Sequence, residues 1–270
     1  MSDSSILSDA PLLSLVVITK DEADRIGELL DSASIADEVV VVDSGSSDAT
    51  VELCRSRGAR VVHHDWQGYA AQKQFALEMA QGEWVLNLDA DEALSEESAE
   101  EILTAIRITG PDVGGFSMPR LSRYLNRWIR HGGWYPDRKV RLVRKGRGRW
   151  VGDGLHETLL VTGPVKNLEH PLLHYVYRDI SDQVKTIDRF SAVTTDHRGS
   201  PGSLAYLLLG LVHAAAKFFE CAIWKLGLLD GAPGLIIAVN SAFYVFLKHA
   251  KAWEKGLPKN ENSAPQTQIR

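Results

Sequence analysis

The chain has 270 residues, 44% of them hydrophobic, which is enough for one sizeable core with or without an appendage. Its formal net charge of −5 argues against a protein that binds nucleic acid with its whole surface. The two cysteines, Cys54 and Cys221, are far apart, so the sequence predicts neither a disulfide framework nor a zinc knuckle, and a reducing compartment is expected.

The two ends of the chain are polar. Residues 1–11 carry acids and serines and lack a basic segment followed by an apolar one, so we predict a flexible N-terminus and no secretory signal. Residues 257–270 are predicted to form a disordered tail. We therefore expect the protein to stay in the cytoplasm.

Short apolar, β-branched runs alternate with helical patterns in the first part of the chain. The predicted strands cover residues 14–19, 38–43, 59–65 and 83–91. Helices are predicted over residues 21–34, 47–58, 68–80 and 95–108, where Ser47 or Asp48 caps the second and Ser95 the fourth. This alternation predicts an α/β fold, a mostly parallel sheet with helices on both faces.

The pattern changes after residue 114. Further strands are predicted at 114–119, 140–145 and 158–163, followed by a loop-like stretch up to His174. The connection between the first two is long and rich in Arg, Trp and Tyr, and such connections in compact domains are usually functional. We assign residues 12–180 to one α/β domain.

Charge is unevenly distributed along this domain. Residues 83–101 hold eight acidic and no basic residues, whereas residues 114–150 hold eleven Lys or Arg and one acid. A field divided in this way suits a site with a cation on one side and an anionic partner on the other. Two solvated faces of opposite sign would give the same pattern.

Residues 181–256 are predicted to form a C-terminal helical region, in which residues 203–256 form a helical hairpin. Two apolar stretches, 203–216 and 235–247, flank a turn predicted at 230–234. A membrane-spanning helix needs about 20 apolar residues, and each stretch only borders on that length. We expect the hairpin to lie in or on a bilayer or to pack between subunits, with packing against the main domain as the alternative.

The triplet Asp89-Ala90-Asp91 closes the fourth predicted strand. Since alternate strand residues share a side, both carboxylates can converge at the sheet edge where α/β proteins bind ligands. Two close carboxylates repel unless a cation lies between them, and Mg²⁺ or Mn²⁺ shared with substrate phosphates meets this need. Acids after a strand also commonly cap helices, so the triplet alone does not decide the matter.

The second strand ends in Asp43, which a Ser/Gly turn follows. Its carboxylate can accept a hydrogen bond from a base or a ribose hydroxyl of a nucleotide bound across the sheet edge. No GxGxxG follows the first strand and no GxxxxGK[ST] occurs in the chain. These absences argue against a dinucleotide oxidoreductase and a P-loop enzyme.

The sequence resembles the inverting family 2 glycosyltransferases, which have the GT-A fold, in four segments that keep the family's order and spacing: ITKDE, VVDSGSSDAT, AAQKQFAL and LNLDADE. Residues 131–157 and 230–254 resemble the bacterial lipopolysaccharide-core branch, whose members are β-1,4-glucosyltransferases acting on an inner-core heptose. The resemblance covers residues 12–255. It implies a Rossmann-like GT-A catalytic domain, with the helical hairpin added at its C-terminus.

The resemblance implies a donor site. Thr19 and Asp43 would contact the uracil or ribose of a UDP-sugar, with Glu22 nearby. Gln72 and Lys73 would approach the nucleotide or its phosphates, unless they are exposed polar residues of a helix. Asp89 would lean toward the ribose, and Asp91 would be the more direct ligand of Mg²⁺ or Mn²⁺. The metal would offset the charge that develops on the leaving diphosphate.

An inverting transferase also needs a base that deprotonates the acceptor hydroxyl. The resemblance points to a carboxylate near the strand that follows the acceptor loop, with Glu157 as first choice and Asp153 or Asp137 as alternatives. His156 would assist the diphosphate or the metal, or serve as a structural hydrogen-bonding residue. The chain lacks the Glu-Asp pair that marks the base in other branches of the family.

The loop between the later strands offers an acceptor site. Trp134 and Tyr135 present flat apolar faces on which a sugar ring can stack, or they pack the loop itself. Arg138 is one of seven arginines that suit phosphate groups of an acceptor or anionic lipid headgroups: Arg120, Arg123, Arg127, Arg130, Arg138, Arg141 and Arg144. Basic charge and an apolar hairpin together suit attachment to a membrane surface.

Taken together, the residues and the resemblance predict a hexosyltransferase that moves glucose from UDP-glucose to a lipopolysaccharide inner core or similar glycolipid. It would act at the cytoplasmic face of the inner membrane, with a possible homo-oligomer through the C-terminal helices. Another polyprenyl- or lipid-linked acceptor and a non-catalytic membrane scaffold are the alternatives. A nucleotidyltransferase would need a Gly-rich basic loop after the first strand, which ITKDEADR lacks.

Overall fold

The computed structural model describes three stretches of the chain, residues 12–152, 157–193 and 203–257. They form two compact units. The first, called the sheet unit here, contains residues 12–123 and 135–176, and the second, the helical unit, contains residues 124–134 and 177–257. The segments expected to be flexible at the N-terminus and disordered at the C-terminus lie outside the described residues, except for residue 257.

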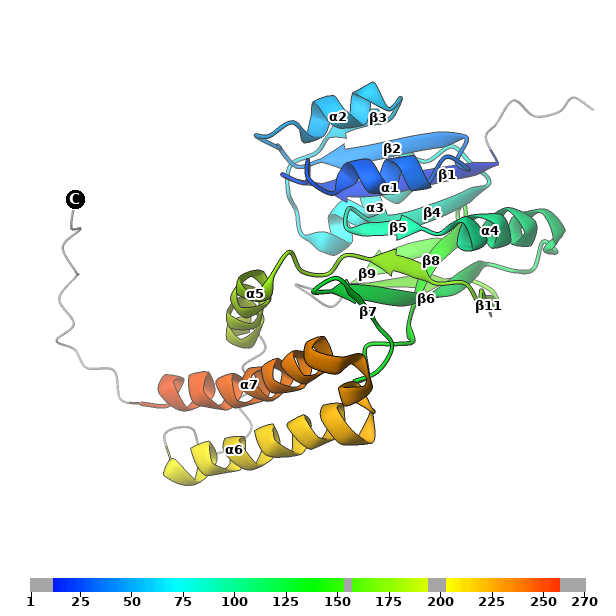
Figure 1. The fold of residues 1–270 in the computed structure, drawn as a ribbon. Helices are drawn as coiled ribbons and strands as arrows, with labels where there is room; N and C mark the ends of the chain where they lie inside the picture. Colours follow the sequence, from blue (N-terminus) through cyan, green and yellow to red (C-terminus); the bar gives the residue numbers. More distant parts are fainter. Residues whose placement is uncertain (1–11, 153–156, 194–202, 258–270) are drawn as a thin grey trace, which may run out of the picture. The chain divides into compact units, whose positions relative to one another are not determined.

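Four parallel strands form the first half of the sheet unit: β1 (Leu13–Thr19), β2 (Glu38–Asp43), β3 (Arg60–His63) and β4 (Trp84–Asp89). They lie in the order β3-β2-β1-β4 (Figure 1). The helices between and after them are α1 (Ile26–Ser32), α2 (Thr50–Ser56), α3 (Tyr69–Met79) and α4 (Glu96–Ile108). The predicted α/β alternation is therefore confirmed, as is the Ser95 cap of α4, where Ser95 and Ser98 bond each other's backbone.

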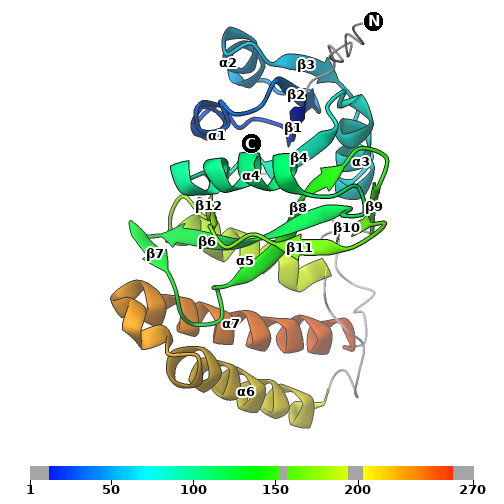
Figure 2. The ribbon, with the colours of Figure 1, turned by 90° about the vertical axis from the view of Figure 1, so that its right-hand side faces the viewer.

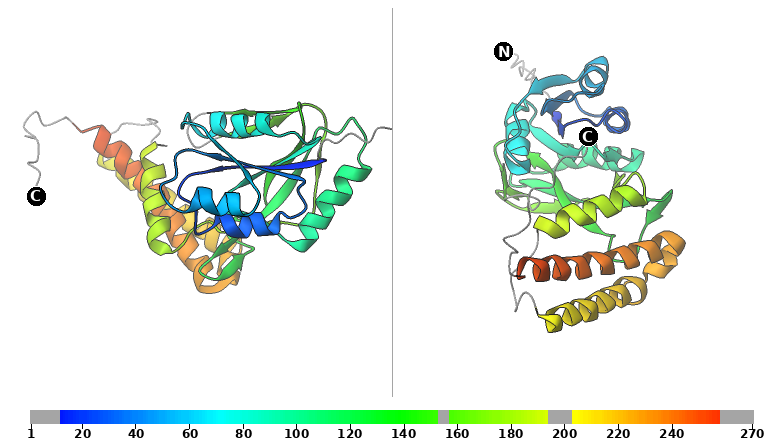
Figure 3. Two further views of the ribbon diagram at one scale, coloured as in Figure 1. Left: turned by 90° about the horizontal axis from the view of Figure 1, so that it is seen from above. Right: turned by 90° about the vertical axis from the view of Figure 1, so that its left-hand side faces the viewer.

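Strand alternation divides the core of the sheet unit between the two faces of the sheet. Leu13, Leu15 and Val17 of β1 point to the face covered by α1, α2 and α4, whereas Val16 points to the face covered by α3 (Figure 3). The same alternation in β4 directs Val85 toward α3. Asp89 follows Val85 by four residues, so it belongs to the α3 side of the sheet.

The second half of the sheet unit is mixed. The strand β8 (Asp137–Arg144) runs antiparallel to both β4 and β6 (Gly115–Tyr124), and the sheet continues through β12 (Leu172–His174) to β5 (Glu92–Leu94). A separate hairpin pairs β9 (Gly148–Val151) with β10 (Thr158–Val161).

The prediction of a loop before His174 is wrong in part. It contains β11 (Val165–Asn167) and β12, both of which run parallel to β6. Each has three residues, which is too short for an alternating pattern to show in the sequence.

The helical unit contains the hairpin of α6 (Leu204–Phe219) and α7 (Gly231–Lys255), which pack side by side (Figure 2). A π-helical turn (Glu220–Trp224) and a 3₁₀ turn (Gly227–Asp230) connect them. The unit also holds β7 (Arg127–Ile129) and α5 (Ile180–Val193); α5 lies almost entirely in the region predicted to be helical, although no separate helix was predicted there. By length and composition alone, the helical stretches Leu204–Trp224 and Gly227–Lys255 could each cross a bilayer.

The turn predicted at residues 230–234 is wrong, because α7 begins at Gly231 and the connection lies before it. Proline fits the first turn of a helix, where its missing N–H has no helical partner to lose, so Pro233 does not break α7. Gly234 is required for close packing, since a Cβ at this residue would lie 1.8 Å from the carbonyl oxygen of Gly227.

Candidate active site

The polar ends of three parallel strands lie at one edge of the sheet. Thr19 of β1 is in register with Asp43 of β2, and Ile18 is in register with Asp89 of β4. This is the edge at which open α/β sheets bind ligands. The prediction that these strand ends meet is confirmed.

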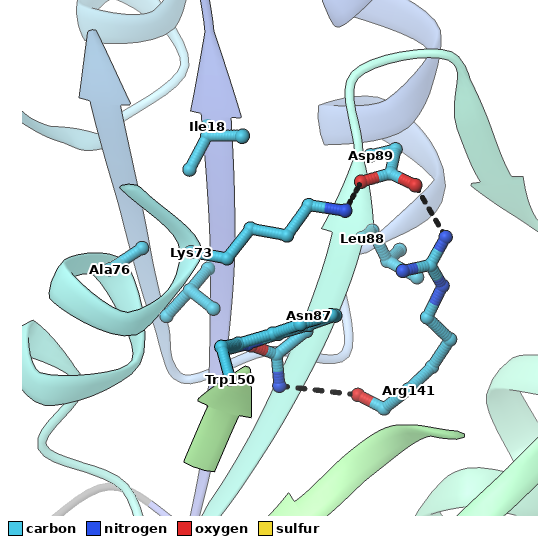
Figure 4. A pocket seen from close by; sticks show the side chains of 9 residues that line it. Ile18, Lys73, Ala76, Asn87, Leu88, Asp89, Arg141 and Trp150 are labelled. Atoms are coloured by element: carbon cyan, nitrogen blue, oxygen red, sulfur yellow. Dashed lines mark hydrogen bonds and ion pairs between the residues drawn. The ribbon is translucent and has the colours of Figure 1, made fainter. Parts of the chain in front are cut away.

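Asp89 is bound by two cations from different elements (Figure 4). Its Oδ1 lies 2.7 Å from Nζ of Lys73 on α3, and its Oδ2 accepts a hydrogen bond from Nη2 of Arg141 on β8. The Lys73 ammonium also lies 2.9 Å from Oε1 of Glu157 and 4.9 Å from the ring centroid of Trp150. Lys73 therefore links the predicted DxD site to the predicted base.

Burial raises the pKa of Asp89, but the positive charges of Arg141 and Lys73 outweigh this and hold that pKa well below its usual value. The carboxylate is ionised at every ordinary pH. Its charge is already balanced by groups of the protein, so it has little net charge left to offer a metal ion.

Asp91 has a different environment. The strand β4 ends at Asp89, so the alternation that was expected to bring the two carboxylates together does not reach Asp91. Its Oδ2 lies 3.6 Å from Nη1 of Arg25 and 3.5 Å from Nε2 of His174, which are longer contacts than those of Asp89, although the exposed fractions of the two side chains, 26% and 27%, are alike. The other imidazole nitrogen, Nδ1, lies 2.9 Å from Oγ of Ser122.

A series of charged side chains extends from Asp89 through Arg141, Glu92 and Arg120 to Asp137. Glu92 is buried, and its Oε2 accepts a hydrogen bond from the Asp89 amide at 3.0 Å. Its Oε1 lies 2.5 Å from Nη2 of Arg141 and 3.4 Å from Nη1 of Arg120. Arg120 continues to Asp137, with 2.6 Å between Nη2 and Oδ2.

Asp137 and Glu157, the predicted bases, are both paired with cations. Besides Arg120, Asp137 contacts Lys139 at 3.1 Å. Burial raises the pKa of Asp137, but Arg120 and Lys139 hold it below its ordinary value of 3.8. The Asp137 side chain is 36% exposed and that of Glu157 is 19% exposed. The alternatives Asp153 and His156 lie outside the described residues.

The polar atoms of Thr19, Glu22 and Asp43 are hydrogen-bonded to different extents. Oγ1 of Thr19 is buried and has no hydrogen-bond partner among the described residues, so it is a polar atom that a ligand could satisfy. The Asp43 carboxylate accepts hydrogen bonds from the amides of Gly45 and Ser46 and from the Ser46 hydroxyl. Glu22 donates its amide to Thr50, and its carbonyl accepts the Ile26 amide at the start of α1.

Gln72 and Lys73 are both buried, so the alternative of exposed helix residues is wrong for this pair. Gln72 connects two loops at the sheet edge. Its amide donates to Oγ of Ser44 at 2.8 Å, and its Oε1 lies 2.7 Å from Nδ1 of His64. Gln72 therefore fixes the turn after Asp43 in place.

The predicted acceptor residues fall in different units. Trp134 belongs to the helical unit and packs against Tyr124 and Tyr177, whereas Tyr135 and Arg138 belong to the sheet unit. Arg138 donates to the carbonyl of Leu168 at 2.8 Å. The loop residues 124–134, which the sequence analysis assigned to the α/β domain, pack within the helical unit.

The comparisons with known proteins agree with this geometry. Residues 14–157 match the family model "Glycosyl transferase family 2". The lipopolysaccharide core biosynthesis glycosyltransferase LpsC of Rhizobium meliloti (strain 1021) is 30% identical over 91% of this chain and 93% of its own length. This chain belongs to glycosyl transferase family 2. It is a glycosyltransferase.

Two further matches cover one third and nearly all of this glycosyltransferase. An uncharacterized glycosyltransferase of Rickettsia bellii (strain RML369-C) is 50% identical over 33% of this chain and 31% of its own length. The mannosyltransferase PcManGT of Pyrobaculum calidifontis, solved with GDP-Man and Mn²⁺, is 17% identical with a TM-score of 0.50, over 92% of this chain and 89% of that one. At this identity the second match shows the fold alone, and that fold is GT-A, as predicted.

The residues around Asp91 fit a divalent ion better than those around Asp89. In the described part of the chain, no group of three or more His, Cys, Asp and Glu side chains could hold a metal by itself. Magnesium and manganese sites in such enzymes commonly use one or two protein ligands and complete their coordination with substrate phosphates. Asp91 and the Nε2 atom of His174 offer such an incomplete set when Nδ1 carries the proton and donates it to Ser122.

Sequence reasoning missed two residues of this site, Glu92 and His174, and it named Arg141 only among the arginines for acceptor phosphates or lipid headgroups. Arg141 lies in a predicted strand, but only the antiparallel pairing of β8 with β4 brings it beside Asp89. His174 lies in β12, which was predicted to be loop. The excess of basic residues between 114 and 150 could have indicated that one of them, such as Arg141, pairs with the acids at the end of β4.

Proposed function

We propose that this glycosyltransferase transfers a hexose, glucose from UDP-glucose, to the lipopolysaccharide inner core or a similar membrane-linked glycan, with inversion at the anomeric carbon. The observation that carries the proposal is the 30% identity over nearly the full length of both chains to a lipopolysaccharide core biosynthesis enzyme. The enzyme would work at the cytoplasmic face of the inner membrane, attached through the apolar hairpin of α6 and α7.

The donor would lie across the strand ends of β1, β2 and β4. The unsatisfied hydroxyl of Thr19 and the edge at Asp43 would face the nucleoside, together with Glu22 and the turn that Gln72 supports. Lys73 and Arg141 lie on the α3 side, where they are shared among the carboxylates of Asp89, Glu157 and Glu92, so a diphosphate would have to replace one of these partners. Cations fixed there stabilise the negative charge of a leaving diphosphate without reorganisation during the reaction.

Asp91, assisted by His174, is the proposed holder of Mg²⁺ or Mn²⁺. When bound, such an ion offsets charge on the departing diphosphate as a Lewis acid. Arg25 would then give up its loose 3.6 Å contact with Asp91. Asp89 contributes indirectly, since it fixes the Lys73 and Arg141 side chains.

The base is assigned to Asp137. Glu157 is held by Lys73 beside Asp89, on the donor side of the site, and its side chain is less exposed than that of Asp137. Asp137 is ionised at neutral pH, as a base must be, although its pairing with Arg120 and Lys139 lowers its pKa and makes it a weaker proton acceptor than an unpaired carboxylate. The acceptor hydroxyl would give its proton to Asp137 while its oxygen attacks the anomeric carbon and the nucleoside diphosphate leaves. Trp134, Tyr135 and Arg138 would bind the acceptor.

The first experiment tests the reaction itself. The full-length protein is incubated with UDP-glucose, GDP-mannose or another nucleotide sugar, with and without Mn²⁺. The acceptor is either lipopolysaccharide truncated at the inner core or a polyprenyl-phosphate-linked sugar, and products are identified by mass spectrometry and by the anomeric coupling in NMR spectra. A β-linked hexose on truncated lipopolysaccharide supports the proposal. Transfer only to the polyprenyl acceptor would mean that the acceptor is polyprenyl-linked. No turnover of any donor would support the alternative of a non-catalytic membrane scaffold.

The second experiment separates the two candidate bases. Asp137→Asn should lower transfer by about 10²–10⁴-fold while UDP-glucose still binds with nearly unchanged affinity. Glu157→Gln should instead weaken donor binding, because Lys73 loses a partner. If Glu157→Gln abolishes transfer and spares donor binding, while Asp137→Asn has little effect, the base is Glu157.

A further inference from the structure

The outer surface of α6 is apolar. Six residues on this surface are between 46% and 70% exposed: Leu204, Leu208, Leu209, Leu211, Val212 and Phe219. At 100° per residue they fall within an arc of about 160° around the helix axis. The opposite side packs on α7 through small residues, and a Cβ at Gly210 would lie 2.6 Å from Cβ of His249. The exposed surface of α6 is therefore mainly apolar.

The turn between α6 and α7 extends this surface. Trp224 is 86% exposed, and four neighbours are also exposed: Ile223, Leu226, Leu228 and Leu229. Cations lie beside them, since the ammonium groups of Lys217 and Lys225 both contact Glu220, and Arg127 donates to the carbonyl of Leu229. Exposed tryptophan and aliphatic residues with Lys and Arg alongside are typical of segments that lie in a membrane interface.

A lipid surface fits this hairpin better than a second copy of the chain. A partner helix would cover one stripe of α6, whereas the exposed arc spans about 160° and continues around the turn. Residues 204–216 and 231–247 carry no formal charge, and the cations are found near the turn and at the end of α7. This distribution suits immersion of the apolar side between lipid headgroups, with the cations facing anionic ones.

One buried carboxylate connects this turn to the loop of residues 124–134. Asp230 is 3% exposed and is both the last residue of the 3₁₀ turn and the N-cap of α7. Its Oδ2 accepts the amides of Arg130 at 3.1 Å and of His131 at 2.8 Å, and its Oδ1 lies 3.1 Å from Nδ1 of His131. Two backbone amides of the loop therefore depend on a side chain of the hairpin.

Close backbone packing reinforces this link. The Gly132 amide donates to the carbonyl of Lys225 at 2.8 Å. A Cβ at Gly133 would lie 2.8 Å from Cδ of Lys225, and one at Gly227 would lie 3.3 Å from Cα of Gly132. Gly132 and Gly133 also have positive φ angles, which glycine adopts without strain. The loop and the turn have little room to move independently.

We propose that the outer face of α6 and the hairpin turn lie in a phospholipid monolayer, and that Asp230 is a positioning residue that fixes the loop of residues 124–134 to this immersed turn. The inference rests on the proposed function in one respect, that the acceptor is membrane-linked. The chain leads from Trp134 within three residues to Asp137, the proposed base. A membrane-bound hairpin would thus present the acceptor loop at the lipid surface.

Vesicle flotation tests the lipid contact. The full-length protein should float with phosphatidylethanolamine–phosphatidylglycerol vesicles, and Val212→Glu should weaken this binding by about tenfold or more. Ile108→Glu is the matched control, because Ile108 is an exposed apolar residue at the end of α4 in the sheet unit, and it should float like the wild type. Absence of flotation, or a concentration-dependent dimer whose formation Val212→Glu blocks, would overturn the lipid assignment.

Hydrogen exchange tests the link to the loop. In the wild type, vesicle binding should slow the exchange of amides in residues 127–134. Asp230→Ala and the isosteric Asp230→Asn should raise exchange at Arg130 and His131 by about tenfold or more and remove the slowing by vesicles. Asp188→Asn is the control, because Asp188 is an exposed carboxylate of the same unit whose partner is Lys251, and it should leave both effects intact.

The outcomes separate this inference from the proposed function. If the wild type binds vesicles but exchange in residues 127–134 does not respond, the positioning role of Asp230 is wrong, whether or not sugar is transferred. If binding and exchange behave as expected but no donor is turned over, the proposed function fails and the membrane coupling stands. Melting temperatures of both Asp230 variants show whether a general loss of folding explains faster exchange, in which case protection would fall throughout α6 and α7.

Discussion

The two carboxylates of the DxD triplet differ more than their spacing of two residues suggests. Asp89 is bound by Lys73 and Arg141 at hydrogen-bonding distance, and its pKa is held low by both cations. Asp91 has Arg25 and His174 at the longer distances of 3.6 and 3.5 Å, whereas the exposed fractions of the two side chains are alike, 27% for Asp89 and 26% for Asp91. One carboxylate is neutralised by the protein and the other is not.

The same residue type can therefore serve two purposes at one strand end. A carboxylate whose charge is balanced by buried cations is a structural group, because moving either partner leaves an unpaired buried charge. A carboxylate with loose and partly exposed contacts can exchange them for a ligand at little cost. We therefore expect substitutions at Asp89 and its partners to change stability, and those at Asp91 and its partners to change metal use.

The largest effect on activity is expected from Asp91→Asn. It should lower metal-dependent turnover by about 10³-fold, because it removes the charged ligand that would hold the ion against the leaving diphosphate. The melting temperature should change little, since the contacts of Asp91 are long. Turnover and thermal unfolding are measured together, with Asp112→Asn as an exposed control. Wild-type activity in Asp91→Asn would remove Asp91 from the metal site.

Arg141→Ala should have the largest effect on stability. It leaves the fully buried Glu92, and the partly exposed Asp89, without their shared cation, and breaking such a buried pair costs about 3–5 kcal/mol of unfolding free energy. Chemical denaturation measures the loss. Arg147→Ala is a suitable control, because that arginine is bound to a loop carbonyl near the surface. A loss below about 1 kcal/mol would contradict the structural role assigned to the Asp89 cluster.

Features set by local patterns could be predicted from the sequence, whereas features set by long-range contacts could not. The strands β1 to β4 and their helices follow from local patterns, since each apolar run and each cap is read within a few residues. The partners of Asp89 do not, because Lys73 lies on α3 and Arg141 on a strand that pairs with β4 only through long-range contacts. The strand period predicted that Asp89 and Asp91 share a side, but β4 ends between them.

The later part of the chain was harder to predict from the sequence, because its structure also depends on long-range contacts. The strands β11 and β12 have three residues each, and His174 became visible as a site residue only when β12 was seen beside β5 and β6. Asp230 was read as part of a turn, and its bonds to Arg130 and His131 join residues a hundred positions apart. No local pattern carries such information.

A smaller effect is expected from His174→Gln. The variant should bind Mn²⁺ in the presence of UDP about 10–100-fold more weakly, because the imidazole beside Asp91 is lost while Asp91 itself remains. Electron paramagnetic resonance of free Mn²⁺ measures the affinity directly, without an acceptor. His170→Gln is the matched control, since His170 lies nearby in the sequence and is paired with Glu101 at 3.0 Å. Equal affinity in both variants would exclude His174 as a metal ligand.

The smallest effect is expected from Arg120→Gln, and it tests the base rather than the metal. Arg120 and Lys139 hold the pKa of Asp137 below 3.8, so the wild-type base is protonated, and its activity lost, only as the pH falls through that lowered value. Removing Arg120 raises the pKa of Asp137, and the acid limb of kcat/KM should therefore move to higher pH. At neutral pH the change should stay below about tenfold, since Asp137 remains ionised and partly exposed. Arg147→Gln should leave the limb in place. If the limb does not move in Arg120→Gln but moves in Lys73→Met, where Glu157 loses its cation, the titrating base is Glu157 and the assignment to Asp137 is wrong.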